Sequence, residues 1–192
     1  MNKLPRHSLV LLLPLFLVAC GEGQDPDDDD QAPELIVLAE RGDLASLDAL
    51  LQRDPRPDVR DSCDWTALMK AALNGHPESV EHLLAAGASV DAEDKGGYTA
   101  MMLAASNDHA AIVARLLEAG AMVDHQERTG GWTALIWAAK QGHLDSVEAL
   151  IAAGADTSLR DFSGRAAADW AEAEGHGEVL DLLGAEGPVS DG

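Results

Sequence analysis

Apolar side chains recur along the chain with the spacing of one helix face. Three successive segments carry them at positions i, i+3 and i+4, which lie on one side of an α-helix. The three sets are Val80, Leu83 and Leu84; Val113, Leu116 and Leu117; and Val147, Leu150 and Ile151. A short alanine-rich run precedes each set, as at Ala71 and Ala138. Each segment therefore predicts two helices, the first of them short and lined with small side chains that allow close packing.

Threonine and glycine residues mark the ends of these helices. Thr66, Thr99 and Thr133 stand immediately before the alanine-rich runs, where a hydroxyl can accept a hydrogen bond from a first-turn amide. Gly75 and Gly142 follow the first helix and can adopt the positive φ that ends it. A polar stretch leads from each second helix to the next threonine, which predicts a turn or hairpin loop between helix pairs.

The same three-residue phrase recurs at a fixed interval. It reads Thr-Ala-Leu from Thr66, Thr-Ala-Met from Thr99 and Thr-Ala-Leu from Thr133, at spacings of 33 and 34 residues. A degraded copy, Ala-Ala-Ala from Ala166, follows 33 residues later. A fixed period of this length indicates one helical unit stacked in an array. Such arrays present extended surfaces for binding partners and have no closed catalytic pocket by default.

The units resemble the ankyrin repeat, whose pattern is D-x-x-G-x-T-P-L-H-x-A-A-x-x-G-H followed by a V…LL helix and Gly-Ala. Units begin at Asp61, Asp94, Arg128 and Asp161 after a divergent first unit. The resemblance covers residues 33–187 and implies an all-α ankyrin-repeat solenoid of about five helix–turn–helix repeats, with divergent caps at both ends. The pattern's proline is alanine throughout, and the third unit is one residue longer near residues 125–128. The pattern's histidine is replaced by Met69, Met102, Ile136 and Asp169.

The N-terminal segment predicts export and a lipid anchor. Lys3 and Arg6 precede an apolar run over residues 8–18 that is too short to cross a bilayer comfortably. Leu-Val-Ala-Cys then ends at Cys20 and resembles the lipobox of bacterial lipoproteins. The resemblance implies a signal peptide over residues 1–19 and a lipid on Cys20. Gly21 replaces the aspartate that retains such proteins at the inner membrane, which implies a periplasm-facing outer-membrane location. An ordinary signal peptide with an unrelated cysteine is the alternative.

Residues 20–32 are expected to form a disordered tether, because their aspartates repel one another and Pro26 blocks regular structure. They lack the turn glycine and spaced glutamate of an EF-hand loop, so calcium binding is not expected. Residues 33–187 then form one domain and residues 188–192 a tail. The other cysteine is Cys63. A lipid on Cys20 would preclude an intramolecular disulfide between the two, and Cys63 is interpreted either as redox-active or as a neutral substitution.

The formal net charge is −21, from 13 basic and 34 acidic residues. Such a chain lacks the basic surface that nucleic acid and anionic lipid require, so we expect no nucleic acid and contact with a membrane only through the lipid anchor. The charge favours a basic protein partner, or simple solubility. A monomer is expected.

Four histidines share one repeat position, at His76, His109, His143 and His176. Neighbouring repeats should stand about 8–10 Å apart, whereas zinc ligands lie about 2 Å from one ion. These side chains therefore cannot converge on a metal, and the ankyrin resemblance implies that they brace the turn between two helices. The sequence contains no P-loop, no G-x-S-x-G elbow and no H-E-x-x-H helix. No enzyme activity, catalytic residue, metal or cofactor is expected.

An aromatic residue precedes each capping threonine, at Trp65, Tyr98 and Trp132. The resemblance places this position at the edge of the concave face, where three rings would form a binding row, since aromatic residues are enriched among interface hot spots. The alternative is that each ring shields the backbone of the next turn. First-helix residues expected to face the same groove are Asn74, Asn107, Lys140 and Gln141. Trp137 and Trp170, inside the first helices, are expected to pack in the core or between repeats.

These observations predict a non-enzymatic, membrane-tethered protein that binds a basic periplasmic protein through its concave face. Two uses fit a periplasmic ankyrin protein: support of a catalase or peroxidase, or immunity against a secreted effector such as a phospholipase. Peroxide sensitivity of a deletion strain would indicate the first, and killing by sibling cells the second. A purely structural envelope spacer is a further alternative.

Overall fold

The computed structural model describes residues 33–185. The predictions for residues 1–32, including Cys20 and the tether, and for the tail at residues 188–192 lie outside the described residues. Between residues 33 and 185 the chain forms ten α-helices and no strand. They are α1 (Glu34–Arg41), α2 (Leu44–Arg53), α3 (Ala67–Leu73), α4 (Pro77–Ala85), α5 (Ala100–Ala105), α6 (Ala110–Glu118), α7 (Ala134–Gln141), α8 (Leu144–Ala152), α9 (Ala167–Glu174) and α10 (Gly177–Ala185).

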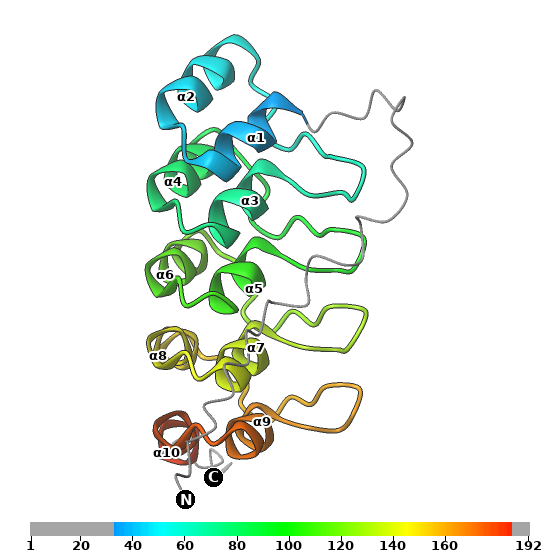
Figure 1. Ribbon diagram of the computed structural model, residues 1–192, viewed down its shortest axis with the longest axis vertical. Coiled ribbons are helices and arrows are strands. Elements are labelled where there is room, and N and C mark those ends of the chain that lie inside the picture. The colour runs from blue at the N-terminus through cyan, green and yellow to red at the C-terminus, as the bar shows by residue number, and fades with distance from the viewer. Residues whose placement is uncertain (1–32, 186–192) are drawn as a thin grey trace, which may run out of the picture. The chain divides into compact units, whose positions relative to one another are not determined.

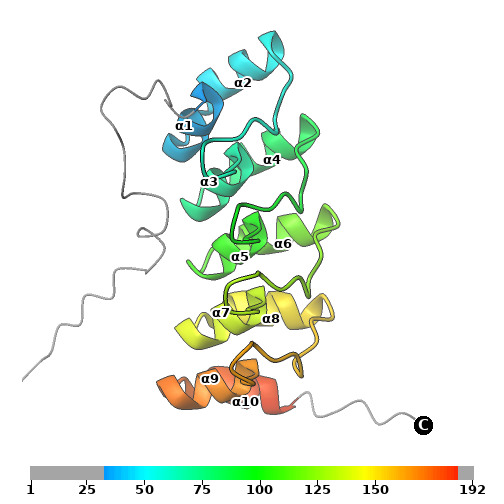
Figure 2. The same ribbon diagram turned by 90° about the vertical axis from the view of Figure 1, so that its right-hand side faces the viewer.

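The ten helices form five pairs stacked one on another (Figure 1). The odd-numbered helices make one layer and the even-numbered helices the other. The loops that join successive pairs project beyond the odd-numbered layer, as Figures 1 and 2 show from two sides. Each odd-numbered helix packs against its own even-numbered partner and against the odd-numbered helices of neighbouring pairs. This arrangement confirms the predicted all-α stack of about five helix–turn–helix repeats.

The first helices begin where the threonine pattern predicts. The Oγ1 atoms of Thr66, Thr99 and Thr133 accept hydrogen bonds from the amides three residues later, at 3.3, 3.4 and 3.2 Å. The last pair has Ala166 in place of threonine. There, Asp169 Oδ2 accepts a hydrogen bond from the amide of Ala166 at 2.8 Å. A carboxylate inside the first turn of α9 thus satisfies the amide that precedes the helix, whereas the acceptor that threonine offers to the first-turn amide is absent in this pair.

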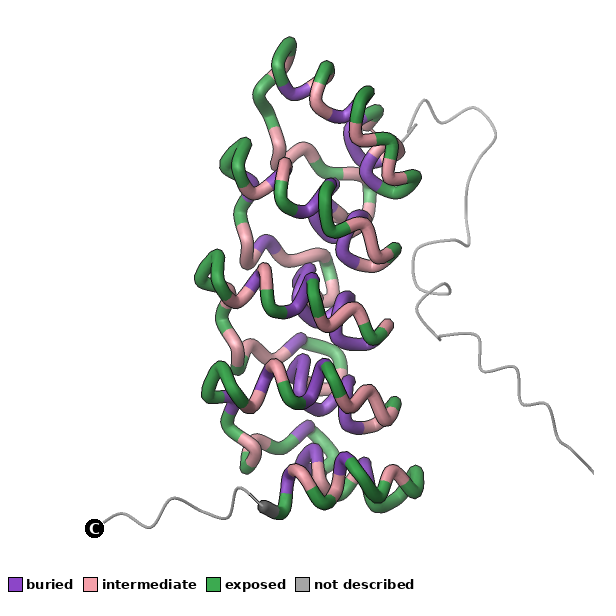
Figure 3. The backbone as a smooth tube through the Cα atoms, turned by 90° about the vertical axis from the view of Figure 1, so that its left-hand side faces the viewer, coloured by how far each residue is buried: buried purple, intermediate pink, exposed green. Residues whose placement is uncertain are grey.

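The core lies between the two helix layers, where Figure 3 shows the buried residues gathered. Alanines of the first helices are completely buried, which lets the layers approach closely: Ala71, Ala72, Ala104, Ala105, Ala138 and Ala139. The second helices bury two of the three apolar residues in each predicted set, with Val80 and Leu83 as one example. Met69, Met102 and Ile136 are each 1% exposed. They fill the core at the position where the ankyrin pattern has histidine.

The four repeat-position histidines join neighbouring helix pairs. Each Nε2 atom lies 3.0–3.2 Å from a backbone oxygen in the last residues of the preceding odd-numbered helix or directly after it. The pairs are His76 with Glu40, His109 with Leu73, His143 with Ser106, and His176 with Lys140. Carbonyls at a helix C-terminus have no partner within the helix. Each ring therefore hydrogen-bonds a free carbonyl of the helix pair before its own. The sequence pattern implied only that the ring braces the turn within its own pair.

A second set of hydrogen bonds between repeats lies after the even-numbered helices. Three aspartates, one repeat apart, each accept a hydrogen bond of 2.9 Å from an amide of the following repeat. The pairs are Asp58 with Ser89, Asp91 with Met122, and Asp124 with Asp156. These acidic side chains therefore link neighbouring repeats, although composition alone would assign them to a solvated surface.

Candidate protein-binding face

A carboxylate at the base of each connecting loop positions the residue that precedes the helix cap. In the second loop, Asp94 Oδ1 accepts hydrogen bonds from the amides of Gly96 at 2.8 Å and Tyr98 at 2.9 Å. Asp61 and Asp161 do the same in the first and last loops. Each carboxylate closes a tight turn. The orientation of the residue before the cap is therefore fixed by backbone amides, before any partner is bound.

The third loop is one residue longer, and Glu127 takes the place of aspartate. Its carboxylate is 1% exposed. Oε1 accepts from the amides of Gly130 at 2.7 Å and Trp132 at 3.0 Å, and Oε2 accepts from the amide and the hydroxyl of Thr129. The extra residue therefore lies between Arg128 and Trp132, slightly later than residues 125–128, where the sequence pattern placed it. The additional methylene of glutamate lets the carboxylate reach across the longer turn.

The loops are joined to one another by backbone hydrogen bonds. Each loop tip donates an amide to a carbonyl of the loop before it: Lys95 to Cys63 at 3.3 Å, Arg128 to Gly96 at 2.8 Å and Phe162 to Gly130 at 2.8 Å. Gln126 adds side-chain bonds to the carbonyls of Gly131 and Arg160. The four loops consequently form a continuous row, and residues at equivalent places in the loops are held in register.

The three rings predicted to form a row occupy equivalent positions in successive repeats, and two of them contact further tryptophans. Trp65, Tyr98 and Trp132 are all half-buried on the loop side of the odd-numbered helices. The Trp132 ring lies 4.3 Å from that of Trp137 and 5.0 Å from that of Trp170, between centroids. Tyr98 lies 6.4 Å from Trp137. Trp137 and Trp170 pack between repeats, as expected, and at the same time join the row.

Three cations lie over these rings. Lys70 Nζ is 4.7 Å from the centroid of Trp65. Lys140 Nζ is 4.9 Å from the centroids of both Trp132 and Trp170. Arg165 stacks on Trp170 from another side, with Cζ 4.4 Å from the centroid. We call the five rings (Trp65, Tyr98, Trp132, Trp137 and Trp170) with Lys70, Lys140 and Arg165 the aromatic face.

The polar residues predicted for this groove divide into two kinds. Asn74 and Asn107 each donate Nδ2 to a carbonyl four residues earlier, at 2.9 Å, and so cap the C-terminal ends of α3 and α5. This local role was not expected. Gln141 is exposed at the end of α7. Lys140 is the predicted groove residue that the structure brings directly against the aromatic rings.

Burial and hydrogen bonding act differently on two of the loop carboxylates. Burial raises the pKa of Asp94 above its ordinary value of 3.8, and the amide hydrogen bonds and Arg128 only partly offset it. Burial also tends to raise the pKa of Asp161, but hydrogen bonds from Ser163, the Arg165 amide and Trp170 outweigh it, so that the pKa is lowered. The Trp170 bond, from Nε1 to Oδ2 at 2.9 Å, links the last loop to the aromatic face.

Asp161→Asn should destabilise the fold by about 1–2 kcal/mol at neutral pH, whereas Asp94→Asn should change it by less than about 0.5 kcal/mol. In Asp161→Asn an amide NH2 replaces Oδ2 and faces the Trp170 donor. A lowered folded-state pKa contributes stability above pH 3.8 that is lost as pH falls through the folded value. Urea unfolding should therefore show the Asp161 difference shrinking on acidification. A difference that stays constant down to pH 3 would contradict the assigned role of the charge.

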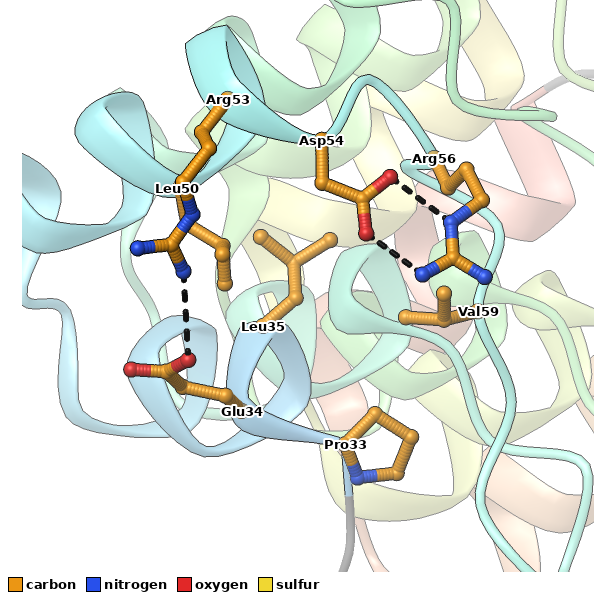
Figure 4. Close-up of a pocket in the computed structure, with 8 residues that line it drawn as sticks. All are labelled: Pro33, Glu34, Leu35, Leu50, Arg53, Asp54, Arg56 and Val59. Carbon is orange, nitrogen blue, oxygen red and sulfur yellow. Dashed lines mark hydrogen bonds and ion pairs between the residues drawn. The ribbon is translucent and has the colours of Figure 1, made fainter.

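A hollow lies away from the aromatic face, at the first helix pair (Figure 4). It has a volume of about 250 Å³ and is lined in part by Leu35, Leu50 and Val59. Its arginines are paired, Arg53 with Glu34 at 3.9 Å and Arg56 with Asp54 through two short contacts. No histidine, cysteine, serine or threonine lines it. Its two carboxylates, Glu34 and Asp54, are the ones paired with these arginines.

Between residues 33 and 185, no group of three or more His, Cys, Asp or Glu side chains could hold a metal ion. None of the helices in that range is long and apolar enough to cross a membrane.

Cys63 lies in the first loop, two residues before Trp65, and is half-buried. The sequence contains one other cysteine, Cys20, which lies outside the described residues. One sulfur cannot carry a thioether-linked lipid and a disulfide at the same time. Lipidation of Cys20 therefore stays a prediction, and an intramolecular disulfide is its direct competitor.

Comparison with known proteins supports the arrangement. The family model for ankyrin repeats (3 copies) matches residues 35–127 and 116–189. These two matches together span all ten helices. A comparison with curated proteins gave no match.

Proposed function

Because this chain belongs to the ankyrin-repeat family, whose repeats form protein-interaction modules, we propose that it binds another protein through the aromatic face. The main support is a cluster of half-buried rings and one cation on the loop side of the stack. It consists of Trp132, Trp137, Trp170 and Lys140. Tryptophan side chains of this kind dominate interface energies because they exclude water from a large area. Ankyrin repeats generally serve binding without catalysis, which agrees with the proposal.

Replacing Trp65 and Trp132 together by alanine should weaken partner binding by more than about 2 kcal/mol. The two rings lie two repeats apart, so a partner that spans the face loses both anchors. The partner is first obtained by affinity purification from the native envelope and mass spectrometry. Its affinity is then measured for the wild type and for the double variant by titration calorimetry.

Met122→Ala is the matched control. Met122 is 51% exposed in the turn after α6, away from the odd-numbered helices, and its loss should leave affinity unchanged within about twofold. Circular dichroism and thermal unfolding show whether each variant remains folded. Equal affinity of wild type and the Trp65/Trp132 variant would remove the aromatic face as the binding site.

We propose further that the domain is held at the periplasmic side of the outer membrane by a lipid on Cys20. The support is the lipobox-like sequence ending at Cys20 and the Gly21 that follows it. Non-reducing mass spectrometry of the purified chain should find residues 1–19 removed and a diacylglyceryl thioether on Cys20. A Cys20–Cys63 disulfide in the same peptide map would refute the anchor. Cys20→Ser should release the protein into the soluble periplasmic fraction.

The expected basic partner rests on the charge of the whole chain, whereas the aromatic face itself carries cations. The charge that a partner presents to this face should therefore match the residues of the face and not the net charge of the chain.

A further inference from the structure

The exposed charges of the four loop tips are basic, although the chain has a net charge of −21. No acidic residue is exposed within residues 60–65, 93–98, 127–132 and 160–165. The exposed charged residues there are Arg60, Lys95, Arg128, Arg160 and Arg165. The loops do contain carboxylates, but Glu127 and Asp161 are turned inward to bond backbone amides. Folding thus turns these two carboxylates toward the backbone and leaves basic side chains exposed on the loops.

Cations of the loops and odd-numbered helices differ in whether a carboxylate already pairs with them. Lys70 pairs with Glu40 at 3.1 Å, and Arg160 with Asp169 at 3.1 Å. Arg128 pairs with Glu93. Lys140 and Arg165 are held instead by indole rings, and among residues 33–185 no carboxylate lies within ion-pair distance of either. Their positive charges remain available to a partner.

The geometry around these two cations is that of a prepared anion site. Lys140 stands over Trp132 and Trp170, and Arg165 stacks on Trp170, all within 4.9 Å of a ring centroid. The rings restrict the long side chains, so less conformational entropy is lost when they pair. Lys140 is also half-buried, which strengthens an ion pair formed there.

We propose that Lys140 and Arg165, with Trp132 and Trp170, bind an acidic and partly apolar segment of the protein partner. The inference rests on the proposed function and specifies the chemistry of its partner. Carboxylates of the segment pair with Lys140 and Arg165, while apolar side chains between them cover the indole rings. Nucleic acid would offer anions and stacking bases as well, but a chain of net charge −21 repels a continuous polyphosphate. A segment with a few spaced carboxylates meets less of that repulsion.

Selection of short peptides from a random phage library on the full chain in detergent micelles tests the proposal. The selected peptides should be enriched in Asp and Glu interspersed with aromatic or aliphatic residues. Their affinity, measured by fluorescence anisotropy at about 0.15 M salt, should fall at least about tenfold in the variant Lys140→Glu with Arg165→Glu. The control variant, Arg53→Glu with Arg56→Glu, changes the net charge equally at the first helix pair. It should alter affinity by less than about twofold.

Peptides without acidic enrichment, or affinity that survives the Lys140/Arg165 reversal, would overturn the proposal. Tighter binding of an oligothymidylate than of the selected peptides would also overturn it, in favour of single-stranded nucleic acid. The proposed function is tested separately by the native partner. If that partner depends on Trp65 and Trp132 but tolerates the Lys140/Arg165 reversal, the binding function stands and the acidic-segment assignment falls.

Discussion

Gly75→Ala should lower the free energy of unfolding by about 3 kcal/mol. Gly75 has φ +71°, a backbone conformation that costs a residue with a Cβ about 1 kcal/mol or more. The new Cβ would also stand 2.6 Å from Cε1 of His109, well inside van der Waals contact. His109 cannot simply turn away, because its Nε2 bonds the carbonyl of Leu73 at 3.1 Å. Either the ring moves and loses that bond, or the two repeats separate.

Gly87→Ala provides the control for backbone strain alone. Gly87 has φ +88°, but a Cβ there would meet no atom within 4 Å. This variant should therefore cost only about 1 kcal/mol. Urea unfolding followed by tryptophan fluorescence measures both. Equal losses in the two variants would show that the contact between glycine and histidine does not hold the repeats together.

Glu127→Ala should cost about 3–4 kcal/mol and weaken partner binding as well. The substitution removes the acceptor for the amides of Thr129, Gly130 and Trp132 in a loop whose carboxylate is 1% exposed. A buried donor left without an acceptor costs about 1–3 kcal/mol, and water entering the opened loop recovers part of the total. Trp132 would then lose the hydrogen bond that orients it toward Lys140. Urea unfolding and calorimetric titration with the partner measure the two effects.

A compensating pair tests the reason for glutamate at this position. Glu127→Asp alone should cost about 2 kcal/mol, because the shorter side chain cannot span a loop with one extra residue. Deleting Thr129 in the same chain produces Asp-Arg-Gly-Gly-Trp-Thr, the pattern of the loop that starts at Asp94. The combined variant should regain most of the lost stability. If deletion of Thr129 makes Glu127→Asp worse, loop length does not explain the choice of glutamate. The bond from Tyr98 to Thr129, at 3.0 Å, is lost in this variant and sets a limit to the recovery.

Local features of the chain predicted the fold well. The caps at Thr66, Thr99 and Thr133 and the burial of Val80 and Leu83 follow from contacts within one or two helical turns. Such contacts depend on spacing along the chain, which the sequence shows directly. The one error of register, around Glu127, arose because alignment locates an extra residue but cannot show which side chain bridges the lengthened turn.

The candidate site was predicted only in part. Trp65, Tyr98 and Trp132 stand directly before the helix caps of successive repeats, and Lys140 lies against Trp132, while their role in binding stays a prediction. That Trp170 lies beside Trp132 could not be read from spacing, because the contact joins a loop of one repeat to a helix of the next. The repeat did contain information about this contact. One position, four residues after each capping position, is aromatic in the last two repeats and lies near the residue before the cap. Its occupants are Lys70, Leu103, Trp137 and Trp170.

The chain by itself specified the helix pairs, their number and their stacking, since each unit carries its own caps, glycines and apolar face. Which charges remain available was decided by the tertiary structure. A composition of 34 acidic and 13 basic residues suggested an acidic surface that favours a basic partner. Folding directs loop carboxylates toward backbone amides, which need acceptors once they leave water, and leaves Lys140 and Arg165 against aromatic rings. The hydrogen-bond requirements of the loop amides, which a count of charges does not contain, therefore decide which charges the aromatic face presents.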